Sequence, residues 1–133
     1  MKYMLILVGT EGEQQGERTP EELQAVMDPW NRFTKEVVEA GAFVAGEGLY
    51  PSSAATTLHH RTGGERIVTD GPFAETKEQV GGFYLLECKD LDEAIEWARK
   101  VPIGEGSSVE IRPVMDFSDF GLEDPYVASR AAR

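Results

Sequence analysis

The sequence predicts one α+β domain in which an antiparallel sheet carries two helices on one face. Three observations lead to this prediction: the expected elements follow the order β-α-β, hairpin, β-α-β; two segments begin with helix-capping signals; and 41% of the 133 residues are hydrophobic. A chain of this size and composition can bury a core without disulfides or a structural metal. When the hairpin is treated as an insertion, the order is that of a ferredoxin-like split βαβ fold.

The first half of the chain is expected to supply a strand, a long helix and a second strand. Residues 3–8 are continuously apolar, which suits a central strand covered on both faces. Thr19 is placed to cap a helix whose first position is Pro20, and an apolar stripe at helical spacing follows. Pro29 lies within that stripe and should kink or split the helix, because proline lacks an N–H group. Gly41 is a suitable residue to end the helix before the second strand.

The second half is expected to contain the hairpin, a strand, a helix and a last strand. Gly63 and Gly64 supply the positive φ values that a hairpin turn requires, within residues 56–69. Asp90 begins the second helix with a capping box, and Pro102 ends it. The strands on either side of this helix are expected at residues 82–88 and 108–114.

Charge and cysteine content exclude several classes of partner. The formal net charge of −11 would repel a phosphate backbone, and the 13 basic residues are scattered singly, so we expect no nucleic-acid partner. The longest apolar run is too short to cross a bilayer, so we expect no membrane association. Cys88 is the only cysteine, which precludes an intrachain disulfide and makes a reducing cytoplasm the expected location.

The pattern of apolar strands predicts a homodimer. Residues 3–8 and 83–86 are apolar at consecutive positions, so both faces of their strands should be covered. Both helices are expected on one face of the sheet, which leaves the other face to be covered by something else. The simplest cover is the identical sheet of a second chain.

One segment is more distinctive than the rest of the chain. Residues 68–84, which include Asp70-Gly71-Pro72-Phe73, closely resemble the signature of the YCII-related, or DGPF-domain, proteins. The resemblance implies a ferredoxin-like dimer of the α+β-barrel type with a cleft between helices and sheet, in bacterial proteins often encoded beside extracytoplasmic-function sigma factors. It extends to residues 2–6, 46–49, 90–94 and 109–114. We accordingly place the YCII-related domain at residues 1–116 and a C-terminal tail at residues 117–133.

The resemblance implies no settled activity. A shorter branch of the family carries a histidine on helix 1 and an aspartate before a proline at the end of helix 2, and this pair is suspected of acid–base work. Trp30 and Val101 stand near those two positions in this sequence, and neither side chain can transfer protons. We therefore do not carry that chemistry over, and whether the chain is an enzyme stays open.

Seven residues are candidates for a ligand-binding cleft. Arg112 would hold a small anionic ligand through its planar guanidinium group. Glu47 or Asp70 would act as a base if burial raised the pKa of its carboxyl group. A structural salt bridge between Arg112 and either carboxylate is the alternative. Trp30 and Tyr84 would form aromatic walls of the cleft or pack in the core. A sharply defined turn explains the signature residues as well as a ligand does. The seven candidates are Asp70, Gly71, Pro72, Phe73, Glu47, Arg112 and Trp30.

We expect no metal and no cofactor. His59 and His60 are neighbours on a strand and point to opposite faces, so they cannot readily chelate one ion and more simply belong to a surface hairpin. No set of Asp, Glu and His ligands is visible elsewhere. Cys88 lies on an apolar strand without an evident base nearby, and we interpret it as an inert core thiol.

Three functions are consistent with these observations. The first is a small-molecule binding or regulatory module linked to a sigma-factor pathway, which needs a cleft but no aligned acid and base. The second is a cofactor-independent enzyme of lyase, isomerase or hydrolase type that uses carboxylates in the cleft. The third is a dimeric scaffold that acts through its surface. We rank the three in this order.

Overall fold

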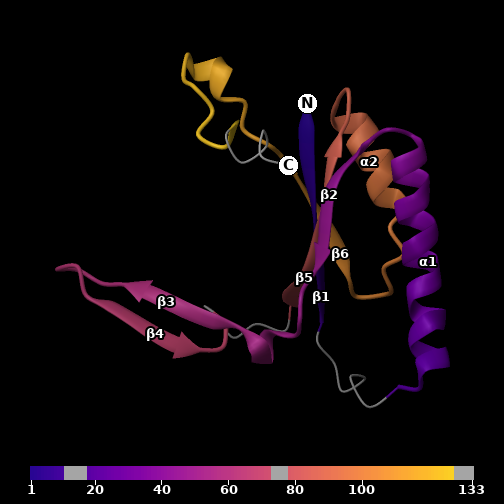
Figure 1. Ribbon diagram of the computed structural model, residues 1–133, viewed down its shortest axis with the longest axis horizontal. Helices are drawn as coiled ribbons and strands as arrows, with labels where there is room; N and C mark the ends of the chain where they lie inside the picture. Colours follow the sequence, from indigo (N-terminus) through magenta and orange to yellow (C-terminus); the bar gives the residue numbers. More distant parts are fainter. Residues whose placement is uncertain (11–17, 73–77, 128–133) are drawn as a thin grey trace.

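The structure is a computed structural model, and it describes residues 1–10, 18–72 and 78–127. Four strands form one antiparallel sheet, two helices cover one of its faces, and a two-stranded hairpin extends away from this body (Figure 1). The predicted α+β fold with an inserted hairpin is therefore confirmed. The elements are β1 (Lys2–Thr10), α1 (Pro20–Glu39), β2 (Phe43–Gly48), η1 (Ser52–Ala54), β3 (Thr56–His60), β4 (Arg66–Asp70), β5 (Glu78–Glu87), α2 (Leu91–Arg99), β6 (Ser108–Pro113) and η2 (Phe117–Phe120).

The main sheet has the strand order of a split βαβ fold. Its order is β2-β5-β1-β6, and every pair of neighbours is antiparallel. The crossover through α1 joins β1 to β2 and leaves room for β5 between them, and the crossover through α2 joins β5 to β6 around β1. This interleaving is the ferredoxin-like arrangement expected from the element order.

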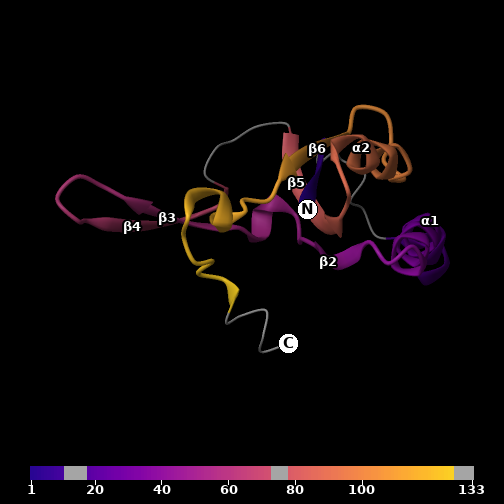
Figure 2. The same ribbon diagram turned by 90° about the horizontal axis from the view of Figure 1, so that it is seen from above.

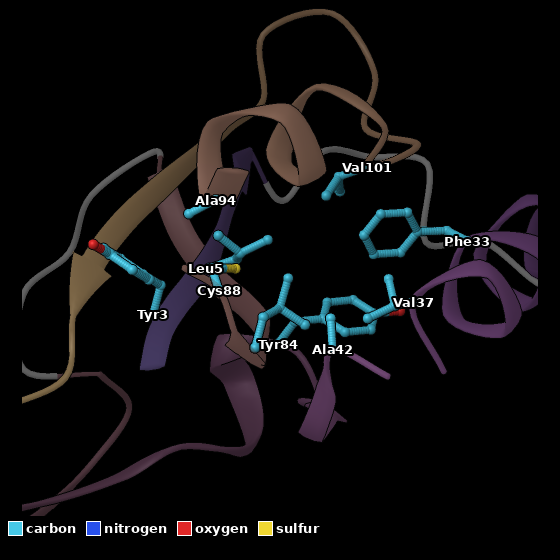
Figure 3. Close-up of a cluster of buried hydrophobic side chains, with 10 residues drawn as sticks. Tyr3, Leu5, Phe33, Val37, Ala42, Tyr84, Cys88, Ala94 and Val101 are labelled. Atoms are coloured by element: carbon cyan, nitrogen blue, oxygen red, sulfur yellow. The ribbon is translucent and has the colours of Figure 1, made fainter. Parts of the chain in front are cut away.

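The hydrophobic core lies between the sheet and the two helices. Figure 3 shows side chains from β1, β5 and both helices converging in this layer. Leu5, Leu86 and Val37 are fully buried, and each contributes about 1.5–3 kcal/mol by leaving water. Tyr3 and Leu5 face the helices, so Met4 and Ile6 face the opposite side of the sheet because side chains alternate along a strand.

Helix α1 begins and ends at the residues expected from the sequence. The backbone N–H of Glu22 donates to Thr19 Oγ1 at 3.1 Å, which caps the first turn. At the other end Gly41 has φ +72°, and the N–H of Ala42 donates to the carbonyl of Val37 at 3.1 Å, which is a Schellman motif.

The expected split at Pro29 is wrong, because α1 runs unbroken from residue 20 to residue 39. The missing N–H of Pro29 leaves the carbonyl of Ala25 without its helical partner. Ala25 is exposed, so water can reach that carbonyl. The second half of the helix is held by tertiary packing, since Phe33 and Val37 are both buried.

The hairpin of β3 and β4 is a separate two-stranded sheet. Gly63 and Gly64 have φ values of +90° and +85°, as the turn prediction required. Figures 1 and 2 show the hairpin and the segment after β6 on the side of the main sheet away from the helices. Among the described helices, none is long and apolar enough to cross a membrane.

Candidate functional site

A cavity of about 340 Å³ lies between α1 and the edge of the sheet formed by β2 and β5. Its size falls at the lower end of the range typical of small-molecule pockets, about 300–1,000 Å³. Helix α1 contributes one wall and the sheet contributes the other. The lining residues are Met27, Trp30 and Thr34 of α1; Leu7 of β1; Phe43, Gly46, Glu47 and Gly48 of β2; and Gly81, Phe83 and Tyr84 of β5.

Two glycines of β2 line this space. A Cβ atom at Gly46 would lie 3.2 Å from the ring of Tyr84 and 3.4 Å from the ring of Phe43, so this position faces the helix side of the sheet. Gly48 is two residues further along the strand and faces the same side. A Cβ at Gly48 would meet no described atom within 4 Å. A side chain at Gly46 would therefore meet these rings, whereas the absence of a side chain at Gly48 leaves room beside α1.

Two irregularities in strand pairing adjoin the cavity. The register between β1 and β5 shifts between Leu7 and Val8, and the register between β2 and β5 shifts between Phe43 and Ala45. Leu7 and Phe43 both line the cavity. β-bulges of this kind re-aim side chains and are over-represented beside functional sites.

The ring of Tyr84 is held by two other aromatic rings. The centroids of Phe33 and Tyr84 are 5.1 Å apart with an interplanar angle of 86°, and those of Phe43 and Tyr84 are 6.4 Å apart at 78°. These edge-to-face contacts are a favourable aromatic geometry. Figure 3 shows the Tyr84 side chain reaching from the sheet toward α1, below Phe33. The Tyr84 ring is therefore packed between two other rings at the cavity wall.

One pair of hydroxyl groups is the main polar feature of the cavity. Thr34 Oγ1 and Tyr84 Oη are 2.7 Å apart and partly buried, and either oxygen can be the donor. Their mutual hydrogen bond uses one O–H group. The other O–H group can donate to a ligand oxygen, and the spare lone pairs can accept from a ligand O–H group.

Glu47 is the only charged residue among the described residues that border the cavity. It follows Gly46 on β2, so strand alternation places its side chain on the face away from the helices. The side chain is exposed, and none of the ion pairs among the described residues involves it. No Lys, Arg or His lines the described part of the cavity.

Of the six predicted site residues that the structure describes, two lie together at the cavity, Trp30 and Glu47. Arg112 lies on β6, at the opposite edge of the sheet from β2. With three strand spacings between β2 and β6, Glu47 and Arg112 are separated by about 14 Å. The structural salt bridge suggested for this pair is therefore wrong, and none links Arg112 to Asp70 among the described ion pairs.

Residues 70–72 of the signature segment form a turn at the base of the hairpin. Asp70 is the exposed last residue of β4, and Gly71 has φ +96°, which confirms the need for glycine there. The N–H of Gly71 donates to the carbonyl of Ala55 at 2.7 Å, and Thr57 Oγ1 donates to the carbonyl of Gly71 at 2.7 Å. Pro72 follows, and Phe73 lies outside the described residues.

The remaining candidates occupy structural positions. His59 Nε2 lies 3.0 Å from Thr69 Oγ1 within the hairpin, and His60 is exposed. Among the described residues, no group of three or more His, Cys, Asp or Glu side chains could hold a metal ion. Cys88 is buried, and burial together with the nearby carboxylate of Glu93 raises the pKa of its thiol, so it is poorly nucleophilic.

The hydroxyl pair was missed from the sequence, although two signals point to it. Thr34 lies four residues after Trp30, so the two share one face of a helix. The other signal is the pattern of glycines at positions 46 and 48 in a strand, because glycine in a strand often marks a close approach or a ligand site. Tyr84 was expected only as an aromatic wall of the cleft, because its contact with Thr34 depends on how closely the helix packs on the sheet.

Comparison with known proteins places the chain in a family. A family model described as the YCII-related domain matches residues 1–118. An uncharacterized protein of Rhizobium meliloti (strain 1021) is 47% identical over 96 residues, which cover 71% of this chain and 77% of that relative. Both findings agree with the resemblance found in the signature segment. The chain therefore belongs to the YCII-related domain family.

Proposed function

We propose that the protein is a small-molecule binding module whose ligand site is the cavity between α1 and β2. The observation that carries this proposal is the cavity itself, about 340 Å³ in volume, with aromatic walls and one hydroxyl pair. Ligand sites typically combine a concave, mainly apolar surface with a few placed polar groups. A regulatory role fits such a site, and its link to a sigma-factor pathway stays a prediction.

Binding is favoured over catalysis because the described lining of the cavity offers no pair of acid and base. The positions of the suspected proton-transfer pair of relatives hold Trp30, which lines the cavity, and Val101, which is buried in the core. Among the described residues that border the cavity, Glu47 is the only one with a carboxylate. General acid–base catalysis needs a group within hydrogen-bond reach of the substrate. A cofactor-independent enzyme that relies on Glu47 is the second candidate.

The proposed active form is a homodimer in which two sheets pack face to face. The face away from the helices is apolar at its centre, where Met4 pairs with Leu85 and Ile6 pairs with Phe83. All four side chains are only half-buried in the single chain. The hairpin and the segment after β6 extend on this same side (Figure 2), so they would flank a second copy. A dimer would complete the burial of this face.

The ligand proposal is tested by filling the cavity from β2. Gly48→Leu places a side chain in open space on the cavity side of the strand without a clash. A set of small uncharged aromatic compounds would be screened by changes in the ¹H–¹⁵N spectrum of the wild-type protein. We expect hits that shift the indole signal of Trp30 in the wild type and leave it unchanged in Gly48→Leu.

A matched control separates cavity filling from a general effect of adding leucine. Gly104 lies in the loop before β6, and a Cβ there also meets no described atom within 4 Å. Gly104→Leu should therefore bind the hits as the wild type does. The proposal is overturned if no compound shifts Trp30, or if Gly48→Leu binds the hits unchanged.

A further inference from the structure

The described lining of the cavity carries no inward charge that could pair with a charged ligand. The side chains that α1 presents are those of Met27, Trp30 and Thr34, and all three are uncharged. On the sheet side, Phe43 and Tyr84 face the helices and are also uncharged. A charged group that enters this space would lose its hydration without gaining a partner, which is costly.

Glu47, the one acidic residue among the described residues at the edge of the cavity, does not offer a charge to a ligand inside it. Glu47 follows Gly46, whose Cβ position faces the rings of Tyr84 and Phe43. Strand alternation therefore directs the Glu47 side chain to the other face of β2, where it is exposed. Its carboxylate is left in water, where it is solvated. A negative charge near the rim also disfavours an anion, as does the net charge of −11 of the whole chain.

The polar requirement of the cavity is set by the hydroxyl pair. Thr34 Oγ1 and Tyr84 Oη already share one hydrogen bond of 2.7 Å, so one O–H group is available for a ligand acceptor. The surrounding rings of Trp30, Phe43 and Tyr84 present flat apolar surfaces. Such surfaces bind planar rings by offset or edge-on contacts.

Building on the proposed ligand site, we infer that its ligand is an uncharged planar ring compound that carries one carbonyl or hydroxyl oxygen. The oxygen lies against the Thr34–Tyr84 hydroxyl pair, and the ring packs among the aromatic side chains. This ligand class differs from the small anion expected from Arg112, which is on the far edge of the sheet. The polar groups that would recognise this ligand, the hydroxyls of Thr34 and Tyr84, are therefore uncharged.

Four probes of similar size separate the contributions of ring, oxygen and charge. Acetophenone is uncharged and has an acceptor oxygen, ethylbenzene lacks the oxygen, benzoate is an anion, and benzylammonium is a cation. Dissociation constants are obtained from the shift of the Trp30 indole signal during titration. We expect acetophenone to bind tightest, ethylbenzene about threefold to tenfold more weakly, and both ions more weakly by about tenfold or more.

Two conservative substitutions test the hydroxyl pair directly. Tyr84→Phe removes one hydroxyl group and Thr34→Val replaces the other by a methyl group of similar size. The double variant should bind acetophenone and ethylbenzene equally. Tyr3→Phe is the matched control, because Tyr3 is a buried tyrosine outside the described cavity lining, and it should keep the preference for acetophenone. Urea denaturation of each variant establishes that it is folded before binding is compared.

The outcomes distinguish this inference from the proposed ligand site itself. If benzoate or benzylammonium binds as tightly as acetophenone, the inference is wrong although the cavity binds ligands. The inference is also wrong if ethylbenzene matches acetophenone in the wild type, or if the double variant keeps the preference. If neither the four probes nor any compound of the wider screen shifts the Trp30 indole signal, both the proposed ligand site and this inference are wrong.

Discussion

Thr34 Oγ1 lies 2.7 Å from Tyr84 Oη, and this hydrogen bond joins α1 to the central strand β5 across 50 positions of the sequence. Tyr84 is at the same time a core residue, with 9% of its surface exposed, and a wall of the cavity. The spacing between helix and sheet at the cavity is therefore fixed by a polar contact as well as by packing. Loss of either hydroxyl should affect both stability and binding.

The stability contribution of this pair is measurable by a double-mutant cycle. Tyr84→Phe and Thr34→Val should each lower the free energy of unfolding by about 1 kcal/mol, because a partner is left without its hydrogen bond. The double variant should lose less than the sum of the two, by about 0.5–1.5 kcal/mol. Urea denaturation provides the values. Strictly additive losses would show that the two hydroxyls do not interact.

A side chain at position 82 is expected to destabilise the protein. A Cβ at this position would lie 2.6 Å from the carbonyl oxygen of Glu47, and that backbone atom belongs to the paired strand β2. Gly82→Ala should therefore push β2 away from β5 and lower the free energy of unfolding by about 1–3 kcal/mol. Gly48→Ala is the control, since its Cβ meets no described atom within 4 Å and its stability should change little. Equal stability of the two variants would contradict the close approach of β2 and β5.

The proposed dimer predicts a mass of about twice the 14.7 kDa of the chain in light scattering at micromolar concentration. Leu85→Lys places a charge at the centre of the exposed sheet face and should produce a monomer, because an unpaired charge buried between two sheets is costly. Val38→Lys adds the same charge to an exposed apolar residue of α1, on the other side of the sheet, and should leave the dimer largely intact. A wild-type protein that scatters as a monomer would contradict the sheet-to-sheet interface.

The buried thiol of Cys88 should lower the free energy of unfolding at alkaline pH. Burial, followed by the charge of Glu93, raises the pKa of this thiol above its ordinary value of 9.0. The folded protein therefore keeps the proton when the unfolded chain has lost it. The stabilising contribution is complete below pH 9.0 and is lost as the pH rises through the folded-state pKa.

The measurement is the free energy of unfolding between neutral and alkaline pH, for the wild type and for Cys88→Ala. The alanine variant will be less stable at neutral pH, since a small cavity is left in the core. Its stability should nevertheless fall less steeply above pH 9.0, because no thiol remains to titrate. Parallel curves for the two proteins would show that Cys88 titrates alike in the folded and unfolded states.

The elements of the fold were predictable because their signals are local. Thr19 and Asp90 each accept a hydrogen bond from the backbone three residues later, which is a contact between near neighbours. The turn glycines and Gly41 adopt positive φ through their own backbone. The strand order then followed from the succession of elements. Of the two effects expected of Pro29, a kink or a split, the split is wrong, since packing in the second half of α1 outweighs the cost of one missing hydrogen bond.

The site was less predictable because it depends on distances across the sheet. Glu47 and Arg112 were correctly placed on strands, but they lie on its two opposite edges. The face on which a strand residue lies changes with a shift of one position, and bulges beside Leu7 and Phe43 alter the register near the cavity. Trp30 was found because helical spacing fixes its face. Tyr84 was likewise expected as an aromatic wall, but its hydrogen bond with Thr34 joins two distant parts of the chain and was missed.

The position of a bound uncharged ring compound is the most direct test of the ligand site. Intermolecular nuclear Overhauser effects would be recorded between acetophenone and the side chains of the wild-type protein. Contacts with the Trp30 indole, the Thr34 methyl group and the Tyr84 ring are the expected result. Contacts with the side chains around Arg112 or Asp70, and none with Trp30, would contradict a ligand site between α1 and β2.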